Sequence, residues 1–380
     1  MIADDVSLAE FCEAIASADY CAIDTEFVRE KTYYPLLSLI QIATEQQMGC
    51  IDPLAIKDFS PLAKILQKPD LLKVFHSPSQ DLEILFQKFD EVPTPIFDTQ
   101  LAAAVIGYTH QMSYADLVFE MTGVRLEKKH TRADWSRRPL SDDELDYAMD
   151  DVRYLMPVYD RLKAQLEEKN RFSWIVKDLE NMSDQSTYEV DFANLWQRLK
   201  GVQKLKPEQL QIASELCQWR EHVAQKKDRP RRWIAADDWI IDIARKKPTS
   251  KEELATIRGL SDKVIERNGK NWLDTVAEAV KVDPKLWPKL QKPEPLSVQQ
   301  QALGDCLMAL SRVIAEENNI ALGTFATRKD IDSLISNRKT SRLAQGWRFT
   351  MGGERLLDFI HGQSMLGVED GLLRSYARGD

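Results

Sequence analysis

The sequence has few cysteines, and none stands close to another. Its 380 residues include five cysteines, and no Cys-x-x-Cys motif occurs. Scattered cysteines of this kind argue against a disulfide framework and predict reduced, mostly buried thiols in a cytosolic protein. They are Cys12, Cys21, Cys50, Cys217 and Cys306.

Long apolar runs are also missing. No run approaches the length that a membrane span requires. The N-terminus, residues 1–5, is acidic and lacks the charged and apolar regions of a signal peptide. We therefore expect a cytoplasmic protein with no membrane partner.

Positive charge is in deficit, with a formal net charge of −9 at pH 7. This balance argues against a protein that coats nucleic acid non-specifically, although local basic patches remain compatible with it. The length of 380 residues predicts two or three domains.

The first candidate site is the stretch Ile23-Asp24-Thr25-Glu26-Phe27. Residues 20–23 form a short apolar run without helical period, which predicts a buried strand. Side chains alternate along a strand, so Asp24 and Glu26 point to the same face. Two carboxylates on one face repel each other, and a divalent cation such as Mg²⁺ or Mn²⁺ would remove that cost. For an isolated Asp-x-Glu, the alternative is a solvent-exposed strand end.

A second acidic position follows a strand predicted at residues 71–75. Ser77 fits a helix N-cap, Pro78 fits the first helical position, and Gln80 completes a capping box. Asp81 then lies at the strand-to-helix junction. Taken alone, this carboxylate is explained by the helix dipole. Beside an Asp-x-Glu strand, it becomes a candidate metal ligand.

The third motif lies on a long helix that Ser141 and Glu144 open with another capping box. We expect this helix to continue to about residue 162. Tyr147 and Asp151 are four residues apart and share a face. Asp150 lies about 100° away around the helix, so we place Asp151 in the site rather than Asp150.

A basic segment precedes this helix. Its tryptophan stands among positive charges, as single-strand nucleic-acid binding needs, and the alternative is a solvated loop. The segment comprises Lys128, Lys129, His130, Arg132, Trp135, Arg137 and Arg138. Among these we take Arg132, Trp135, Arg137 and Arg138 as candidate nucleic-acid contacts.

The three acidic motifs together resemble the DEDD exonucleases, in the branch that uses tyrosine. The resemblance rests on residues 24–27, 76–81 and 147–151, and residues 134–141 are similar to a pattern of bacterial ribonuclease D. It implies a ribonuclease-H-like α/β exonuclease domain over residues 1–170, with a mixed sheet flanked by helices.

The second half of the chain resembles the helicase-and-ribonuclease-D C-terminal (HRDC) domain. Residues 248–254 and Arg258-Gly259-Leu260 carry this likeness. It implies a small all-α helical bundle at 205–285, after a helical linker at 171–204. Residues 295–380 are expected to form a second, diverged HRDC-like helical domain. Arg231 and Arg232 are candidate RNA contacts, with a solvated loop as the alternative.

The resemblance implies a 3′→5′ exoribonuclease that uses two divalent ions, Mg²⁺ or Mn²⁺, and releases nucleoside 5′-monophosphates. Asp24 would bridge both ions, Glu26 and Asp151 would complete the water-activating site, and Asp81 would serve the leaving-group ion. Tyr147 would position the water, because a phenol with a pKa near ~10 is a weak base at neutral pH.

The family implies an RNA partner, namely transfer-RNA precursors with 3′ extensions and other small structured RNAs, and a monomeric enzyme. One alternative is a tyrosine-type 3′→5′ DNA exonuclease, which a comparison of matched RNA and DNA strands would separate. The other is a catalytically inactive RNA-binding protein. Because all four carboxylates and Tyr147 are present, we favour the enzyme.

Overall fold

The computed structural model of the chain describes residues 1–127, 133–290 and 295–378. The chain divides into two compact units. The first comprises Met1–Glu26, Leu37–Tyr188 and the C-terminal part from Glu294, and the second comprises Phe27–Leu36 and Glu189–Pro293.

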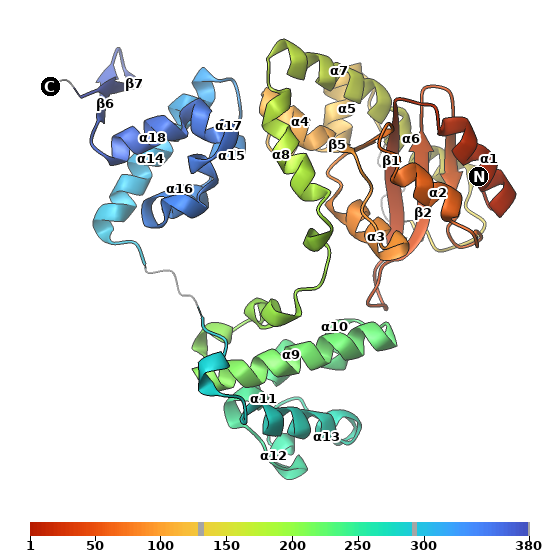
Figure 1. The fold of residues 1–380 in the computed structure, drawn as a ribbon, viewed down its shortest axis with the longest axis vertical. Coiled ribbons are helices and arrows are strands. Elements are labelled where there is room, and N and C mark those ends of the chain that lie inside the picture. The colour runs from red at the N-terminus through yellow and green to blue at the C-terminus, as the bar shows by residue number, and fades with distance from the viewer. Residues whose placement is uncertain (128–132, 291–294, 379–380) are drawn as a thin grey trace. The chain divides into compact units, whose positions relative to one another are not determined.

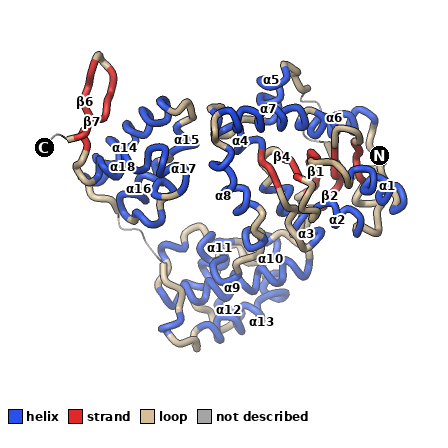
Figure 2. The backbone as a smooth tube through the Cα atoms, turned by 45° about the horizontal axis from the view of Figure 1, so that its top comes forward, coloured by secondary structure: helices blue, strands red, loops and turns tan. Residues whose placement is uncertain are grey.

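A mixed sheet lies at the centre of the N-terminal half (Figure 2). Its strands are β1 (Tyr20–Val28), β2 (Leu36–Ala43), β3 (Met48–Ile51), β4 (Leu72–Phe75) and β5 (Ile96–Asp98), in the order β3-β2-β1-β4-β5. β2 and β3 pair antiparallel, whereas β4 is parallel to both β1 and β5. The mixed sheet that we predicted is confirmed.

Helices pack around this sheet and bury its apolar side chains, which include Ile23, Leu39 and Phe97. They are α1 (Asp5–Ile15), α2 (Ser60–Leu66), α3 (Ser79–Phe89), α4 (Thr99–Ile106), α5 (Tyr114–Thr122), α6 (Asp142–Arg153), α7 (Leu155–Glu168) and α8 (Phe172–Met182). A 3₁₀ turn at Gln185–Thr187 ends this part of the unit.

The single long helix that we expected after Ser141 is two helices, with the break at Tyr154. Pro157 explains the break, because it has no N–H to donate to the carbonyl of Arg153 and its ring would clash there. The predicted capping box of Ser141 and Glu144 is present at the start of α6.

The start of α3 also differs from the prediction. Pro78 rather than Ser77 is its N-cap, and no side chain caps the helix. Ser77 has a φ of 58°, and its N–H donates to Asp98 Oδ1 at 2.9 Å. The Ser-Pro pair therefore forms a tight turn that is held from β5.

The C-terminal part of the first unit is helical but ends in a hairpin that we did not predict (Figure 2). Its helices are α14 (Val298–Glu317), α15 (Leu322–Phe325), α16 (Arg328–Ser336), α17 (Gly346–Arg348) and α18 (Glu354–Ile360), with 3₁₀ turns at Arg338–Thr340 and Arg342–Ala344 and a π turn at Phe349–Gly353. The strands β6 (Ser364–Glu369) and β7 (Leu372–Ala377) follow. Asp370 and Gly371 both have positive φ, as a two-residue hairpin turn requires.

These C-terminal helices pack on α8 within the first unit. Trp174 and Trp347 stack with their ring centroids 4.6 Å apart and an interplanar angle of 2°. Beside them, Arg348 Nη1 lies 3.7 Å from Asp178 Oδ2. The contact joins the two parts of the chain through aromatic stacking and a largely buried guanidinium.

The second unit is a helical bundle around α9 (Pro207–Lys227) (Figure 1). The other helices are α10 (Arg231–Ile234), α11 (Asp237–Lys246), α12 (Lys251–Ala255) and α13 (Asp262–Ala279), with short 3₁₀ turns at Phe192–Arg198, Val202–Lys204 and Pro284–Leu286. Trp272, Ile243 and Leu216 are buried in its core. The expected linker at 171–204 is divided at Tyr188 between the two units.

Four of the five cysteines are buried, as predicted, and Cys306 is exposed. Within the described ranges, we find no helix that is both long and apolar enough to cross a membrane.

Candidate active site

Strand β1 places two carboxylates side by side. Ile23 and Thr25 are buried, whereas Asp24 and Glu26 alternate with them and are half-buried. Asp151 reaches the same place from α6. An oxygen from each of these three carboxylates lies within 4.8 Å of the others, a separation that one metal ion can span. The sequence pattern thus converges in space as expected.

Asp81 enters from the first turn of α3 and is oriented by Thr25. The hydroxyl of Thr25 donates to Asp81 Oδ1. Asp81 lies outside the group of three, but its charge raises the pKa of both Asp24 and Glu26. It is therefore close enough to act in the same electrostatic site.

The site is electrostatically unfavourable without a cation. Burial first, and then the neighbouring carboxylates, raise the pKa of Asp24 well above its ordinary value. The same causes raise the pKa of Glu26 to about 8 and that of Asp151 to about 7. Burial also raises the pKa of Asp81 to about 6. A hard divalent cation, which prefers carboxylate oxygens, fits this set of ligands.

Tyr147 lies one turn before Asp151 on α6 and its ring faces that of Trp135. The two ring centroids are 6.4 Å apart with an interplanar angle of 23°. Burial, followed by the charges of Asp151, Glu26 and Asp24, raises the pKa of Tyr147 to about 12. The phenol therefore keeps its proton at neutral pH and can donate a hydrogen bond.

Other acidic groups nearby have structural partners. Asp150 forms an ion pair with Arg153, the next turn along α6. Asp98 caps α4 by accepting from the N–H of Gln100 at 2.9 Å. The ion pair of Asp150 agrees with the sequence analysis, which placed Asp151 in the site rather than Asp150.

Two residues near the site were missed by the sequence analysis. Thr25 orients Asp81, although the alternation of β1 turns its side chain away from Asp24 and Glu26. Tyr114 is largely buried and donates its hydroxyl proton to the carbonyl of Asp150 at 2.8 Å, which fixes the last turn of α6. Neither residue carries a motif signal, because each acts through a partner far away in the sequence.

The described arginines of the basic segment before α6 have partners within the protein. Trp135 is only 4% exposed, so the expectation that it stacks on an RNA base is wrong. Arg138 pairs with Asp52 through two nitrogens at 2.7 Å and also donates to the carbonyl of Ser38. Arg137 donates to both carboxylate oxygens of Glu144. Arg132, Lys128, Lys129 and His130 lie outside the described residues.

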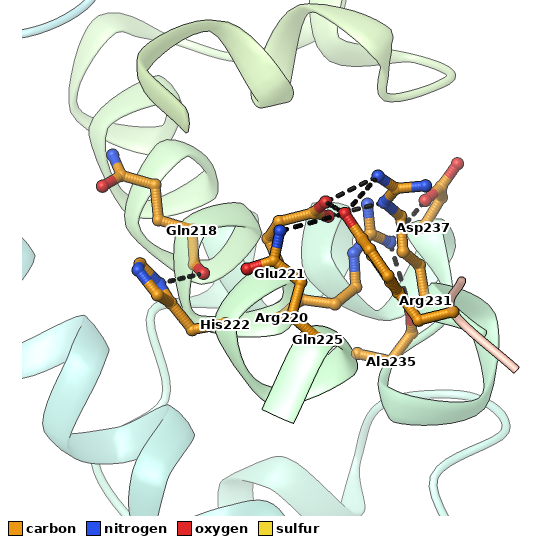
Figure 3. Close-up of polar contacts among 9 residues, drawn as sticks. Gln218, Arg220, Glu221, His222, Gln225, Arg231, Ala235 and Asp237 are labelled. Atoms are coloured by element: carbon orange, nitrogen blue, oxygen red, sulfur yellow. Dashed lines mark hydrogen bonds and ion pairs between the residues drawn. The ribbon is translucent and has the colours of Figure 1, made fainter. Parts of the chain in front are cut away.

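Arg231 in the second unit also has a structural partner (Figure 3). Its guanidinium donates to both carboxylate oxygens of Glu221, whose side chain is 1% exposed. The same guanidinium lies 4.7 Å from the centre of the Tyr33 ring. The charge of Arg231 is thus balanced by Glu221, although both Arg231 and Arg232 are exposed.

Comparisons with known proteins agree with this geometry. Residues 1–167 match the family model described as 3′-5′ exonuclease, and residues 209–276 match the HRDC domain. A ribonuclease D from Sphingobium indicum is 35% identical over 98% of this chain and 97% of its own length. The chain belongs to the ribonuclease D family. A ribonuclease D from Nitrobacter hamburgensis is 36% identical over the same shares of the two chains.

A solved structure supports the assignment. The crystal structure of Escherichia coli RNase D, an exoribonuclease involved in structured RNA processing, has a TM-score of 0.85 and 31% identity, covering 95% of this chain and 98% of the other. As a ribonuclease D, the protein is a hydrolytic 3′→5′ exoribonuclease that acts on RNA. The exonuclease match and the carboxylate cluster support dependence on a divalent metal.

Proposed function

We propose that this ribonuclease D shortens the 3′ ends of transfer-RNA precursors and other small structured RNAs, one nucleoside 5′-monophosphate at a time. The observation that carries the catalytic part is the convergence of Asp24, Glu26 and Asp151 within 4.8 Å, with Asp81 oriented beside them. The substrate class rests on the family resemblance. A monomer acting in the cytoplasm and a second HRDC-like domain at residues 295–380 complete the proposal.

Two divalent ions, Mg²⁺ or Mn²⁺, would be held by the four carboxylates of Asp24, Glu26, Asp81 and Asp151. When bound, such ions stabilise the charge on the attacking and leaving oxygens of a phosphodiester. The chain supplies the ligands, and Thr25 fixes the direction of Asp81 by its hydrogen bond. The cluster gains most from cations above the raised pKa values, because its carboxylates must be ionised to bind them.

Tyr147 contributes a positioned donor. With its pKa raised to about 12, its hydroxyl stays protonated at neutral pH. We infer that it donates to the attacking water or to a phosphate oxygen, and that it does not remove a proton. The near-parallel ring of the buried Trp135 supports the phenol ring in this position.

The first experiment uses a 5′-labelled RNA with a single-stranded 3′ tail, and a DNA of matched sequence. We expect a ladder that shortens from the 3′ end of RNA with Mg²⁺ or Mn²⁺ and stops with EDTA. Asp151→Asn is expected to slow the reaction by about 10²–10³-fold. Asp150→Asn, the matched control one residue away, is expected to stay near the wild-type rate. Equal loss in both variants, or faster cleavage of DNA, would contradict the proposal.

Two variants separate the finer parts. Tyr147→Phe is expected to lower kcat without removing a limb of the pH profile, whereas loss of a limb would make Tyr147 a base.

Asp81→Asn is expected to reduce the Mn²⁺ stoichiometry in calorimetry from two ions to one. A transfer-RNA precursor with a 3′ extension should be trimmed faster than a single-stranded RNA of equal length, and the reverse order would contradict the proposed substrate.

A further inference from the structure

A cationic hollow lies in the second unit, between the end of α9, the short helix α10 and α13. Its volume is about 260 Å³, just below the range of roughly 300–1,000 Å³ for ligand pockets, which suits one nucleotide rather than a large cofactor. The hollow is lined by Lys227, Arg229, Trp233, Ile234, Arg267 and Asn268.

The charge of this lining is of one sign. Lys227, Arg229 and Arg267 are exposed, and within the described part of the chain none of them forms an ion pair. Lys263 and Lys270 precede and follow Arg267 by four and three residues on α13, so they extend the same helix face. In a protein with a net charge of −9, this is a local positive surface that would attract a polyanion.

An exposed aromatic ring lies among these positively charged side chains. Trp233 is 53% exposed, and the guanidinium of Arg229 lies 6.0 Å from its ring centre. The neighbouring wall is fixed, because Ile234 and Asn268 are buried. Asn268 Nδ2 also donates to the carbonyl of Ile234 at 3.4 Å and ties α13 to α10. The ring is thus presented to solvent from an ordered support.

The rim of the hollow is held by residues 27–36, which belong to the same unit. Asp228 Oδ1 accepts from the N–H groups of Tyr33 and Tyr34 at 2.9 and 3.1 Å. Arg229 Nη1 donates to the carbonyl of Lys31 at 3.4 Å. The carboxylate of Asp228, between Lys227 and Arg229, is therefore hydrogen-bonded to backbone amides.

We propose that this hollow binds single-stranded RNA, with a base stacked on Trp233 and the adjoining phosphates contacted by Lys227, Arg229 and Arg267. Every base has a face for stacking and every nucleotide has a phosphate, so such a site holds RNA without reading its sequence. The proposal rests on the RNA substrate of the proposed function. The proposed RNA contacts are therefore the neighbouring cations of the hollow, which form no ion pair in the described part of the chain, and not Arg231, which is paired with Glu221.

The test measures binding of a fluorescently labelled single-stranded RNA to the full-length protein in EDTA, where cleavage is suppressed. Trp233→Ala is expected to weaken binding about tenfold, and Trp233→Phe to retain most of the affinity. Arg267→Ala is expected to reduce the slope of log K against log salt by about 0.7. Lys281→Ala, which removes an exposed charge just after the end of α13 that is paired with Glu278, is the matched control and is expected to change neither quantity.

Cleavage assays with Mg²⁺ separate this proposal from the function on which it rests. Trp233→Ala is expected to raise KM for a long single-stranded RNA and to leave kcat unchanged. Unchanged RNA binding in Trp233→Ala and Arg267→Ala, with cleavage intact, would overturn the hollow as an RNA site and favour an acidic protein partner. Absence of RNA cleavage by the wild type would instead overturn the proposed function.

Discussion

Asp24 is the residue on which the repulsion among the active-site carboxylates acts most strongly. Its pKa is raised by burial and by the charges of Asp81, Asp151 and Glu26. Its backbone position is fixed by the buried strand β1, so the side chain cannot move away from these neighbours. The cost is therefore built into the fold and is relieved only by protons or by cations.

This arrangement predicts an unusual pH dependence of stability in the metal-free protein. The folded-state pKa values of Glu26, Asp151 and Asp81, about 8, 7 and 6, lie above the ordinary carboxylate values. The folded protein then holds protons that the unfolded chain releases, so stability is lost as the pH rises from about 4 to about 8.

Calorimetry in EDTA checks this expectation at about pH 5.5 and about pH 8. The Tm of Asp24→Asn minus that of the wild type should be larger at the higher pH, by about 2–4 °C for each kcal/mol of relieved repulsion. Mg²⁺ should raise the wild-type Tm mainly at the higher pH. A difference that shrinks as the pH rises would show that the carboxylates are stabilised by other groups.

At the scale of elements, α6 is the one on which the site depends most, because it carries Tyr147 and Asp151. Its start is a complete capping box, in which Ser141 Oγ accepts from the N–H of Glu144 and Glu144 accepts from the N–H of Ser141. Ser141→Ala is expected to destabilise the protein by about 1 kcal/mol, since the N–H of Glu144 loses its acceptor.

Urea unfolding measures this loss, and Ser141→Asp is the control because aspartate is also a good N-cap. If Ser141→Asp lost as much stability as Ser141→Ala, the contribution would come from packing and not from the cap.

The sequence predicted secondary structure well where the signal depends only on residues a few positions apart. The alternation of β1, the capping box of α6 and the i, i+4 relation of Tyr147 and Asp151 are examples. The β6–β7 hairpin was missed although Asp370-Gly371 is a typical hairpin signal, because helices dominate the preceding residues. The break at Tyr154 was missed because the apolar stripe continues across it, while Pro157 interrupts the backbone hydrogen bonds.

At the scale of the whole molecule, the C-terminal helices belong to the same unit as the exonuclease sheet. Arg348, whose side chain is 11% exposed, lies over Trp347 at 4.2 Å and donates to the carbonyl of Thr324 at 3.2 Å. Arg348→Ala is expected to destabilise the protein by about 1–3 kcal/mol, because it removes charged hydrogen bonds and packing at this contact.

Urea unfolding together with limited proteolysis tests this role. Arg355→Ala removes a more exposed arginine that pairs with Glu317 in the same region, and should cost less than about 1 kcal/mol. Equal effects of the two substitutions would mean that the burial of Arg348 adds no stability to the contact between the C-terminal helices and α8.

By itself, the sequence determined the order of the three acidic motifs, the face that Asp24 and Glu26 share, and the division into an α/β half and a helical half. The shared face and the motif spacing follow from periodicity over a few residues, and the division into halves follows from the family resemblance. Tertiary structure alone decided which basic and aromatic residues remain available to RNA. Arg138 meets Asp52 across 86 positions, Trp135 is buried, and Glu221 neutralises Arg231. Trp233 stays exposed. Burial and ion pairing depend on partners that only folding brings together, so local pattern leaves them open.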